Sequence, residues 1–310
     1  MDNDIFCSVV IPVHNEEKNI MELYARLTRV LFSLNKPYEI IYVNDGSTDT
    51  SIDILHKIAR SDKQVKIVDL SRNFGHQTAI SAGISFASGK AAIIMDADLQ
   101  DPPSVIPEFI KRWEDGFYVV YGIRRKRKES FFKRSCYFIF YRIQEKMAKI
   151  SIPLDAGDFC LMDKKVVDIL KKMPERNRFI RGIRSWIGFP QIGIEYERDS
   201  RFGGKPKYSL RKLIRLAFDG IYSFSDIPLK ISLIFGSFIS ILCFVFILYI
   251  IYQRLFYGTS IYGIATISVS ILFLGGIQLI AIGVIGEYIG RIYDEVKQRP
   301  IFIIKQIVNL

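Results

Sequence analysis

The chain is poor in cysteine and histidine, with four and three among its 310 residues. The cysteines lie far apart, without the paired spacing of a disulfide framework or a zinc site, at Cys7, Cys136, Cys160 and Cys243. We therefore expect reduced thiols in a reducing compartment. The N-terminus begins Met-Asp-Asn-Asp and has neither a basic segment nor the apolar core of a signal peptide, so the sequence predicts no signal peptide.

Glycine motifs that cradle phosphate are also missing. No Gly-x-Gly-x-x-Gly follows the first predicted strand, and no Walker-type Gly-x-x-x-x-Gly-Lys loop occurs. The formal net charge of +11 nevertheless indicates an anionic partner, such as nucleic acid, a membrane surface or a phosphorylated substrate. Without a glycine cradle, phosphate is expected to be held by a metal ion and basic side chains.

Two long uncharged segments are present near the carboxyl end, at residues 231–252 and 261–286. Each exceeds the ~20 residues that a helix needs to cross a bilayer. The alternative is a pair of buried helices in a soluble domain. Basic residues flank the pair on the outside, at Arg211, Lys212, Arg215, Lys230, Arg291, Lys297, Arg299 and Lys305. The positive-inside rule then places both termini in the cytoplasm.

The amino-terminal part alternates between strand and helix patterns. Apolar runs at 6–12, 38–43, 65–70 and before Asp96 predict strands, and amphipathic or small-residue stretches between them predict helices. Asn15 is a candidate N-cap of the first helix. The alternation predicts right-handed βαβ units and a parallel sheet, whose ligands bind beyond the carboxyl ends of the strands.

Two carboxylates, Asp96 and Asp98, end the fourth predicted strand, and Gln100 follows them. Oxygen ligands grouped in this way suit a hard divalent cation, with the remaining positions left for water and substrate phosphate. The simpler alternative is an acidic turn after a strand.

Four motifs together resemble a known family. They are Ser-Val-Val-Ile-Pro-Val-His-Asn-Glu-Glu at 8–17, Val-Asn-Asp-Gly-Ser-Thr-Asp at 43–49, Ser-Arg-Asn-Phe-Gly-His-Gln at 71–77 and Asp-Ala-Asp-Leu-Gln-Asp-Pro-Pro at 96–103. The set is similar to the inverting glycosyltransferases that include dolichol-phosphate mannose synthase. It most resembles bacterial polyprenyl-phosphate glycosyltransferases with two C-terminal membrane helices, including bactoprenol glucosyltransferases that modify O-antigen in the cell envelope.

The resemblance implies an A-type glycosyltransferase fold, which is α/β and Rossmann-like with a mostly parallel sheet. It implies a site for Mg²⁺ or Mn²⁺ at Asp96, Asp98 and Gln100. It also implies a donor-binding set at Pro12, His14, Glu16, Asp45, Arg72, His76, Arg201 and Lys207. For His14, Arg72 and His76 the alternative is a solvated surface residue, and for the loop that carries Arg201 and Lys207 it is a plain linker.

The acceptor side is assigned in the same way. A basic, aromatic-rich segment at 124–142 predicts a helix on an anionic bilayer, since no nucleic-acid-binding module accompanies it; the alternative is a solvated charged face. Within it, Arg124 and Arg134 are candidates for binding the lipid phosphate. Asp158, in Gly157-Asp158-Phe159, is a candidate base or orienting carboxylate, or else a turn aspartate. These three and Asp98 form the predicted catalytic set.

The predicted organisation has four parts: a cytoplasmic catalytic domain at 1–208, an interfacial helix at 209–228, a transmembrane hairpin at 229–288 and a cytoplasmic tail at 289–310. The expected reaction transfers a hexose, with glucose favoured, from a UDP-sugar to polyprenyl phosphate at a bacterial cytoplasmic membrane. Gly286 and Gly290 make a homo-oligomer plausible. The alternatives are a non-catalytic nucleotide-binding scaffold and a processive glycan synthase, although segment 179–186 matches the synthase Gln-x-x-Arg-Trp element poorly.

Overall fold

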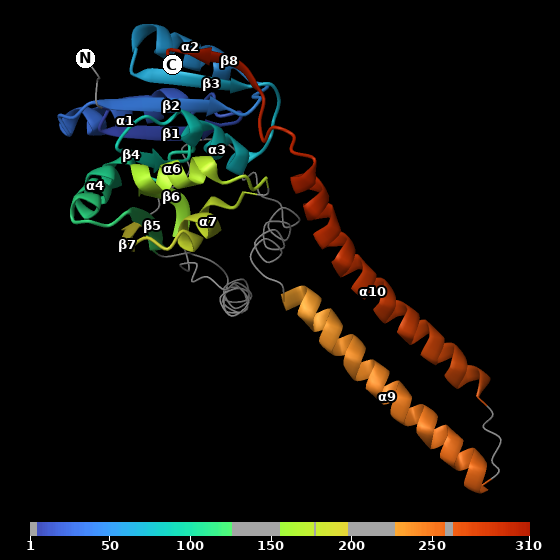
Figure 1. Ribbon diagram of the computed structural model, residues 1–310. Helices are drawn as coiled ribbons and strands as arrows, with labels where there is room; N and C mark the ends of the chain where they lie inside the picture. Colours follow the sequence, from blue (N-terminus) through green and yellow to red (C-terminus); the bar gives the residue numbers. More distant parts are fainter. Residues whose placement is uncertain (1–4, 126–155, 177, 198–226, 258–262) are drawn as a thin grey trace. The chain divides into compact units, whose positions relative to one another are not determined.

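The computed structural model describes residues 5–125, 156–176, 178–197, 227–257 and 263–310 (Figure 1). The chain forms two compact units, one of Met1–Gly220 with Arg299–Leu310 and the other of Ile221–Gln298. All but the last two residues of the predicted interfacial helix, 209–228, and most of the basic segment 124–142 lie outside the described residues.

The first unit is built on an eight-stranded sheet with the order β7-β5-β6-β4-β1-β2-β3-β8. The strands are β1 (Cys7–Val13), β2 (Tyr38–Asn44), β3 (Val65–Leu70), β4 (Ala91–Ile94), β5 (Val119–Arg125), β6 (Ala156–Asp163), β7 (Gln191–Glu197) and β8 (Ile304–Val308). The pairs β1–β2, β2–β3, β1–β4 and β5–β7 are parallel, and β3–β8, β4–β6 and β5–β6 are antiparallel. The sheet is therefore mostly parallel, as the sequence predicts.

Helices connect the strands in the expected alternation. They are α1 (Ile20–Ser33), α2 (Ser51–Ser61), α3 (His76–Phe86), the 3₁₀ turn η1 (Pro103–Val105), α4 (Ile106–Glu114), α6 (Lys164–Lys172) and α7 (Ile180–Trp186). The first four strands agree with the predicted ranges to within a few residues, and helices lie between them as predicted, because both rest on short-range apolar periodicity.

The start of α1 differs from the prediction. The helix begins at Ile20 after Asn19, and Asn15 lies before it in the left-handed region with φ 55°. The side chain of Asn15 accepts a hydrogen bond from the Thr48 backbone N–H at 2.8 Å. The prediction that Asn15 caps α1 is therefore wrong, because this side chain instead ties the loop after β1 to the loop after β2.

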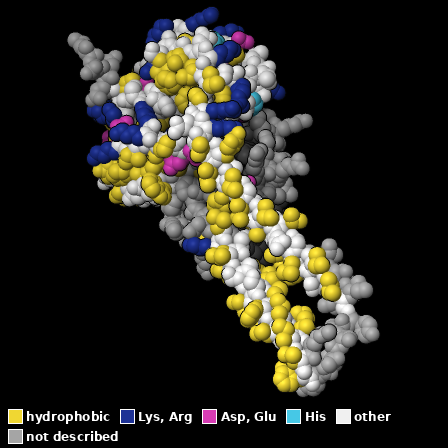
Figure 2. All heavy atoms as spheres, turned by 45° about the vertical axis from the view of Figure 1, so that its right-hand side comes forward, with side chains coloured by type: hydrophobic (Ala, Val, Ile, Leu, Met, Phe, Trp, Pro, Cys, Tyr) yellow, Lys and Arg dark blue, Asp and Glu magenta, His cyan; other side chains and the backbone are white. Residues whose placement is uncertain are grey.

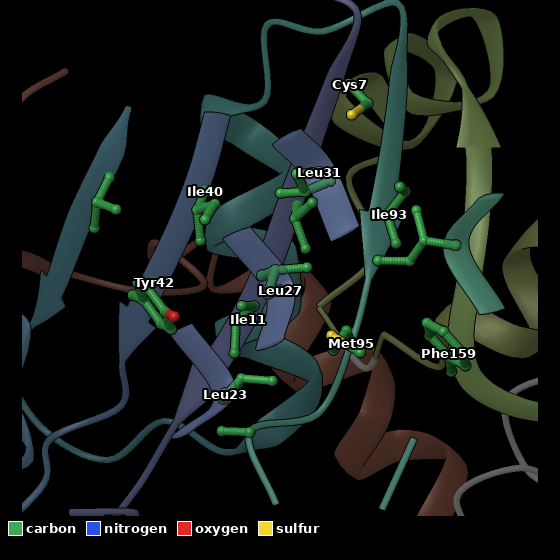
Figure 3. Close-up of a cluster of buried hydrophobic side chains, with 14 of the residues drawn as sticks. Cys7, Ile11, Leu23, Leu27, Leu31, Ile40, Tyr42, Ile93, Met95 and Phe159 are labelled. Carbon is green, nitrogen blue, oxygen red and sulfur yellow. The ribbon is translucent and has the colours of Figure 1, made fainter. Parts of the chain in front are cut away.

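One hydrophobic core lies between the sheet and its helices (Figure 3). Leu23, Leu27 and Leu31 recur every four residues along α1, so they share one face of the helix, and all three are fully buried. That face packs into a cluster with Ile11 of β1 and Ile93 of β4. Burying each such side chain stabilises the fold by about 1.5–3 kcal/mol.

The antiparallel strand β6 brings a distant segment to the end of β4. Ile94 pairs with Cys160, and the same register continued two residues further places Asp96 opposite Asp158. The sheet thus aligns two of the predicted site residues that lie far apart in the sequence.

The second unit contains two long helices, α9 (Ile227–Tyr257) and α10 (Ile264–Val296). Within them, Leu229–Gln253 and Val269–Val296 are long and apolar enough to cross a membrane. Figure 2 shows hydrophobic side chains along both helices, and large ones such as Leu233, Phe244 and Leu279 are more than half exposed. Exposed apolar helices of this length are typical of membrane spans.

Candidate active site

A group of charged side chains, here called the Asp158 cluster, lies where β4 ends and β6 begins. Its members are His76, Gln77, Asp96, Asp158 and Arg181. Nε2 of His76 is 3.5 Å from Oδ1 of Asp96 and 3.4 Å from Oδ2 of Asp158. His76 is the first residue of α3, so the imidazole stands between the two carboxylates.

Asp158 is buried, and several hydrogen-bond donors offset the hydration that its carboxylate loses. Nε of Arg181 donates to Oδ1 at 2.7 Å and Nη2 donates to Oδ2 at 3.0 Å, which is a bidentate pair. Nε2 of Gln77 donates to Oδ2 at 3.2 Å. Burial alone would raise the pKa of Asp158, but Arg181 and His76 hold it well below its usual value. Asp158 therefore stays ionised at neutral pH and suits an orienting role better than that of a base.

The carboxylates of this cluster also shift the pKa values of the groups beside them. Burial alone would lower the pKa of His76, but Asp96 and Asp158 raise it to about 9. Burial raises the pKa of Asp96 to about 6, with His76 opposing and Asp101, Asp158 and Asp98 adding to the rise. The imidazolium is thus the favoured form of His76 at neutral pH.

Gln77 and Arg181 were not among the predicted site residues. Gln77 also accepts a hydrogen bond from the Ile180 backbone N–H at 3.0 Å, so its amide joins α3 to both β6 and the start of α7. The sequence signal was available, since Gln77 ends the motif at 71–77 and Arg181 lies in the segment 179–186. Neither signal by itself indicated Asp158 as the shared partner.

The predicted metal ligands lie at the carboxyl end of β4. Oδ1 of Asp96 is buried and accepts no hydrogen bond from a described residue. Oδ1 of Asp98 accepts from the Gln100 backbone N–H at 3.2 Å, across Leu99 with φ 61°. Oxygen donors of this kind fit Mg²⁺ or Mn²⁺. Within the described residues, no group of three or more His, Cys, Asp or Glu side chains is arranged to hold a metal ion.

Arg124 takes part in a second buried contact. Its Nη2 is 3.8 Å from Oδ2 of Asp101, its Nε donates to the Tyr196 hydroxyl at 3.4 Å, and that hydroxyl donates to Asp101. A Cβ on Gly157 would meet Nη2 of Arg124 at 3.3 Å. Arg124 thus packs on the backbone beside Asp158, and its partners Asp101 and Tyr196 were not among the predicted residues.

The second group, here called the Asp45 cluster, joins the loops after β1, β2 and β3. Its members are His14, Asp45, Asn73, Phe74 and Gly75. Asp45 accepts from the backbone N–H groups of Phe74 at 2.7 Å and Gly75 at 3.0 Å. Nδ1 of His14 lies 2.9 Å from the Asp45 carbonyl oxygen and 3.1 Å from Nδ2 of Asn73.

Other predicted donor-binding residues surround this cluster. The Glu16 backbone N–H donates to Ser51 Oγ at 2.9 Å, Pro12 is buried in β1, and the Arg72 guanidinium lies 4.1 Å from the centre of the Phe74 ring. Gly46 has φ 60°, and a Cβ there would meet Asn73 N at 2.5 Å, so only glycine fits. Arg134, Arg201 and Lys207 lie outside the described residues.

Comparison with known proteins places these features in a family. Residues 8–170 match the model described as glycosyl transferase family 2. The chain belongs to this family. It is 48% identical to the uncharacterized glycosyltransferase YkcC of Bacillus subtilis, over 99% of this chain and 95% of that protein. It is 43% identical to the SfII prophage-derived bactoprenol glucosyl transferase of Shigella flexneri, over 96% of this chain and 97% of that protein.

Family membership makes the chain a glycosyltransferase, and its mostly parallel α/β sheet is that of the A type, as the sequence motifs predict. A solved structure, the mannosyltransferase PcManGT from Pyrobaculum calidifontis in complex with GDP-Man and Mn²⁺, is 16% identical with a TM-score of 0.46, over 68% of this chain and 60% of that one. That likeness is too distant to carry an argument about ligands.

Proposed function

We propose that the protein transfers a hexose, with glucose favoured, from a UDP-sugar to undecaprenyl or another polyprenyl phosphate, with inversion at the anomeric carbon. The observation that carries this proposal is the full-length likeness to a protein named bactoprenol glucosyl transferase, at 43% identity over 96% of the chain. The likeness includes the two apolar helices, so it extends beyond the nucleotide-binding part to the membrane segment.

The arrangement of the site supports separate roles for the Asp45 cluster and the Asp158 cluster. The Asp45 cluster joins the loops at the ends of β1, β2 and β3, and we assign it, with Pro12, Glu16 and Arg72, to the nucleoside of the donor. The Asp158 cluster lies at the end of β4 and the start of β6, and we assign it to the reacting centre. Ligands of open α/β sheets bind at this edge.

A divalent metal ion fits the residues present. Asp96, Asp98 and Gln100 would hold Mg²⁺ or Mn²⁺, and the buried Oδ1 of Asp96 is a suitable first ligand. The other positions would go to water and the donor diphosphate, because the described residues offer no larger ligand group. When bound, the ion neutralises charge on the departing diphosphate.

The acceptor needs little help from a base. A phosphate monoester has its second pKa near ~6, so it is largely ionised at neutral pH. One of its oxygens forms the bond to C1 as the bond from C1 to the UDP oxygen breaks on the opposite face. Asp158, held ionised by Arg181 and His76, orients these cations rather than removing a proton. Arg124 and Arg134 are the proposed contacts of the acceptor phosphate, and Arg201 and Lys207 those of the donor diphosphate.

The location proposed is a bacterial cytoplasmic membrane, with the catalytic domain and both termini in the cytoplasm. The two candidate spans separate β7 from β8, yet both strands belong to the same sheet. Two crossings return the chain to its starting side, which agrees with the flanking basic residues. We retain the boundaries 1–208, 209–228, 229–288 and 289–310, with residues 299–310 joining the catalytic unit. A homo-oligomer remains part of the proposal.

The test uses the full-length protein in detergent, a panel of radiolabelled UDP-sugars, undecaprenyl phosphate and either Mg²⁺ or Mn²⁺. Labelled lipid that forms with one sugar and disappears with EDTA is the expected result, and it identifies the donor. Metal-dependent UDP binding without labelled lipid from any donor would refute the transfer to this lipid and favour a nucleotide-binding scaffold. A product that carries several sugars would favour a processive synthase.

A further inference from the structure

The last strand of the chain enters the sheet beside the Asp45 cluster. β8 pairs antiparallel with β3, and Ile304 stands opposite Leu70, so the first residue of β8 lies beside the last residue of β3. α10 ends at Val296, and the chain that follows it therefore joins the sheet at the edge where the parallel strands end. That edge carries the candidate site.

A backbone hydrogen bond fastens this entry to the Asp45 cluster. Ser71 N–H donates to the Ile303 carbonyl at 2.9 Å. Ser71 follows β3 directly and opens the segment whose Phe74 and Gly75 N–H groups bind Asp45. The segment 71–75 thus connects the chain just before β8 with the Asp45 carboxylate, since it is hydrogen-bonded to Ile303 at one end and to Asp45 at the other.

A second connection runs through side chains across three neighbouring strands. Nζ of Lys305 on β8 lies 3.5 Å from Oδ2 of Asp69 on β3. Nδ2 of Asn44 on β2 donates to Oδ1 of Asp69 at 2.7 Å, and the Ser47 N–H donates to Oδ1 of Asn44 at 3.3 Å. This series of contacts from Lys305 to Ser47, here called the side-chain ladder, ends at the turn 44–47, which contains Asp45.

Burial gives this ladder a defined geometry. Asp69 and Asn44 are each 3% exposed, whereas the Lys305 side chain lies at the surface. A buried carboxylate needs hydrogen bonds and a nearby cation to offset its lost hydration. Asn44 supplies the hydrogen bond and Lys305 supplies the cation. A change at Lys305 therefore acts on the orientation of Asp69 and, through it, on Asn44.

We propose that β8 is a positioning element of the nucleotide pocket, and that Lys305 is its positioning residue, acting through Asp69 and Asn44 on the turn that carries Asp45. The inference rests on the proposed function, because it takes the Asp45 cluster as the nucleoside site. It means that the segment returning from the second candidate span contributes to donor affinity.

The chain offers a matched pair of variants, Lys305→Met and Lys63→Met. Each removes one positive charge and one side-chain contact: Lys305→Met removes the contact from β8 to Asp69 of β3, and Lys63→Met removes the hydrogen bond that Nζ of Lys63 donates to Oδ1 of Asn309, the residue that follows β8, at 3.3 Å. Calorimetric titration of full-length protein with UDP should give about three-fold weaker binding for Lys305→Met and unchanged binding for Lys63→Met. Lys305→Arg should retain wild-type affinity.

Uridine separates positioning from a general attraction of anions. Because uridine carries no phosphate, a misplaced turn weakens uridine and UDP by the same factor, whereas a lost long-range charge weakens UDP alone. Competition of uridine against UDP measures this in each variant. The thermal unfolding temperature is recorded alongside, and both Met variants should lower it by a similar small amount.

Two results would overturn the proposal. One is equal UDP affinity in the two Met variants, which would make β8 purely structural. The other is weakened UDP binding by Lys305→Met with uridine unaffected, which would reduce Lys305 to a surface charge. A wild-type protein that transfers sugar from a donor without uridine would instead refute the assigned nucleoside, and this outcome is recognised from the donor panel alone.

Discussion

Asp45 and Asp158 are both buried carboxylates at one edge of one sheet, but they are compensated in different ways. Asp45 accepts two backbone N–H groups, from Phe74 and Gly75. Asp158 accepts side-chain donors from Arg181 and Gln77 and lies beside His76. Backbone donors carry no net charge and follow from the path of one loop, whereas the side-chain donors come from two helices, and only Arg181 of α7 brings formal charge, since the Gln77 amide of α3 is neutral.

The difference indicates what each carboxylate controls. Substitution of Asp45 removes hydrogen bonds that hold the loop after β3, which we propose to bind the donor, so we expect the effect in donor binding. Substitution within the Asp158 cluster leaves buried charges without partners at the proposed reacting centre, so we expect the effect in turnover. The predictions that follow test this contrast, from the largest expected effect on activity to the smallest.

The largest effect is expected at the end of β4. Asp96→Asn and Asp98→Ala should each lower kcat by about 100- to 1000-fold, because the metal ion that we propose these residues hold would contribute several kcal/mol of charge stabilisation, and each 1.36 kcal/mol is tenfold. EDTA should abolish wild-type activity, and added Mg²⁺ or Mn²⁺ should restore it. Turnover that is insensitive to EDTA would contradict the metal assignment.

The next effect is expected at the Arg181–Asp158 pair. Asp158→Asn and Arg181→Met should each lower kcat by about 10- to 100-fold with little change in donor KM, since a charge-assisted pair is worth about 1.5–3 kcal/mol. The double variant should lose no more than the worse single variant, because the two side chains act as one unit. Additive losses in this cycle, or a loss at Asp158→Asn greater than at Asp96→Asn, would refute this division of roles.

A smaller effect on turnover is expected at Asp45. In Asp45→Asn the amide nitrogen must face one of the two backbone N–H donors, so one hydrogen bond is lost and the loop shifts. The donor KM should rise about tenfold with kcat within a factor of two of the wild type. A fall in kcat at unchanged KM would place Asp45 with the reacting groups and erase the contrast with Asp158.

The smallest effect on activity is expected at Glu39, a buried carboxylate that contacts neither cluster. It binds Lys66, Ser8 and Ser88. Glu39→Gln should lower the free energy of unfolding by about 2–4 kcal/mol, measured by denaturant titration, while kcat and KM of the folded protein stay unchanged. Altered kinetic constants would mean that burial of a carboxylate, and not its position, governs the effects above.

Glu39 also predicts a pH dependence. Burial alone would raise its pKa, but Lys66 and the Ser8 and Ser88 donors outweigh burial and lower it from 4.5. A carboxylate with a lowered folded-state pKa stabilises the fold above its unfolded pKa, and this contribution is lost as the pH falls through the folded value. The Tm difference between wild type and Glu39→Gln should therefore shrink below about pH 4.5. A constant difference from pH 7 to pH 3 would contradict this assignment.

Short-range sequence patterns were sufficient to predict the main strands and helices and the family. The strand at 65–70 matches β3, the apolar segment 231–252 lies within α9, most of the segment 261–286 lies in α10, and the motifs led to the correct family. These features depend on residues a few positions apart, where side-chain periodicity and composition decide the outcome. The N-cap at Asn15 failed for the opposite reason, because its partner Thr48 belongs to another loop.

The sequence by itself determined the alternating α/β pattern, the apolar helices and the position of Asp96 and Asp98 at the end of a strand. Only the tertiary structure decided that β8 completes the sheet at β3, that Arg181 and Gln77 hold Asp158, and that Tyr196 and Arg124 meet at Asp101. The physical reason is that strand order and side-chain pairing join distant segments, and the free energy of these contacts depends on packing that no short stretch of sequence records.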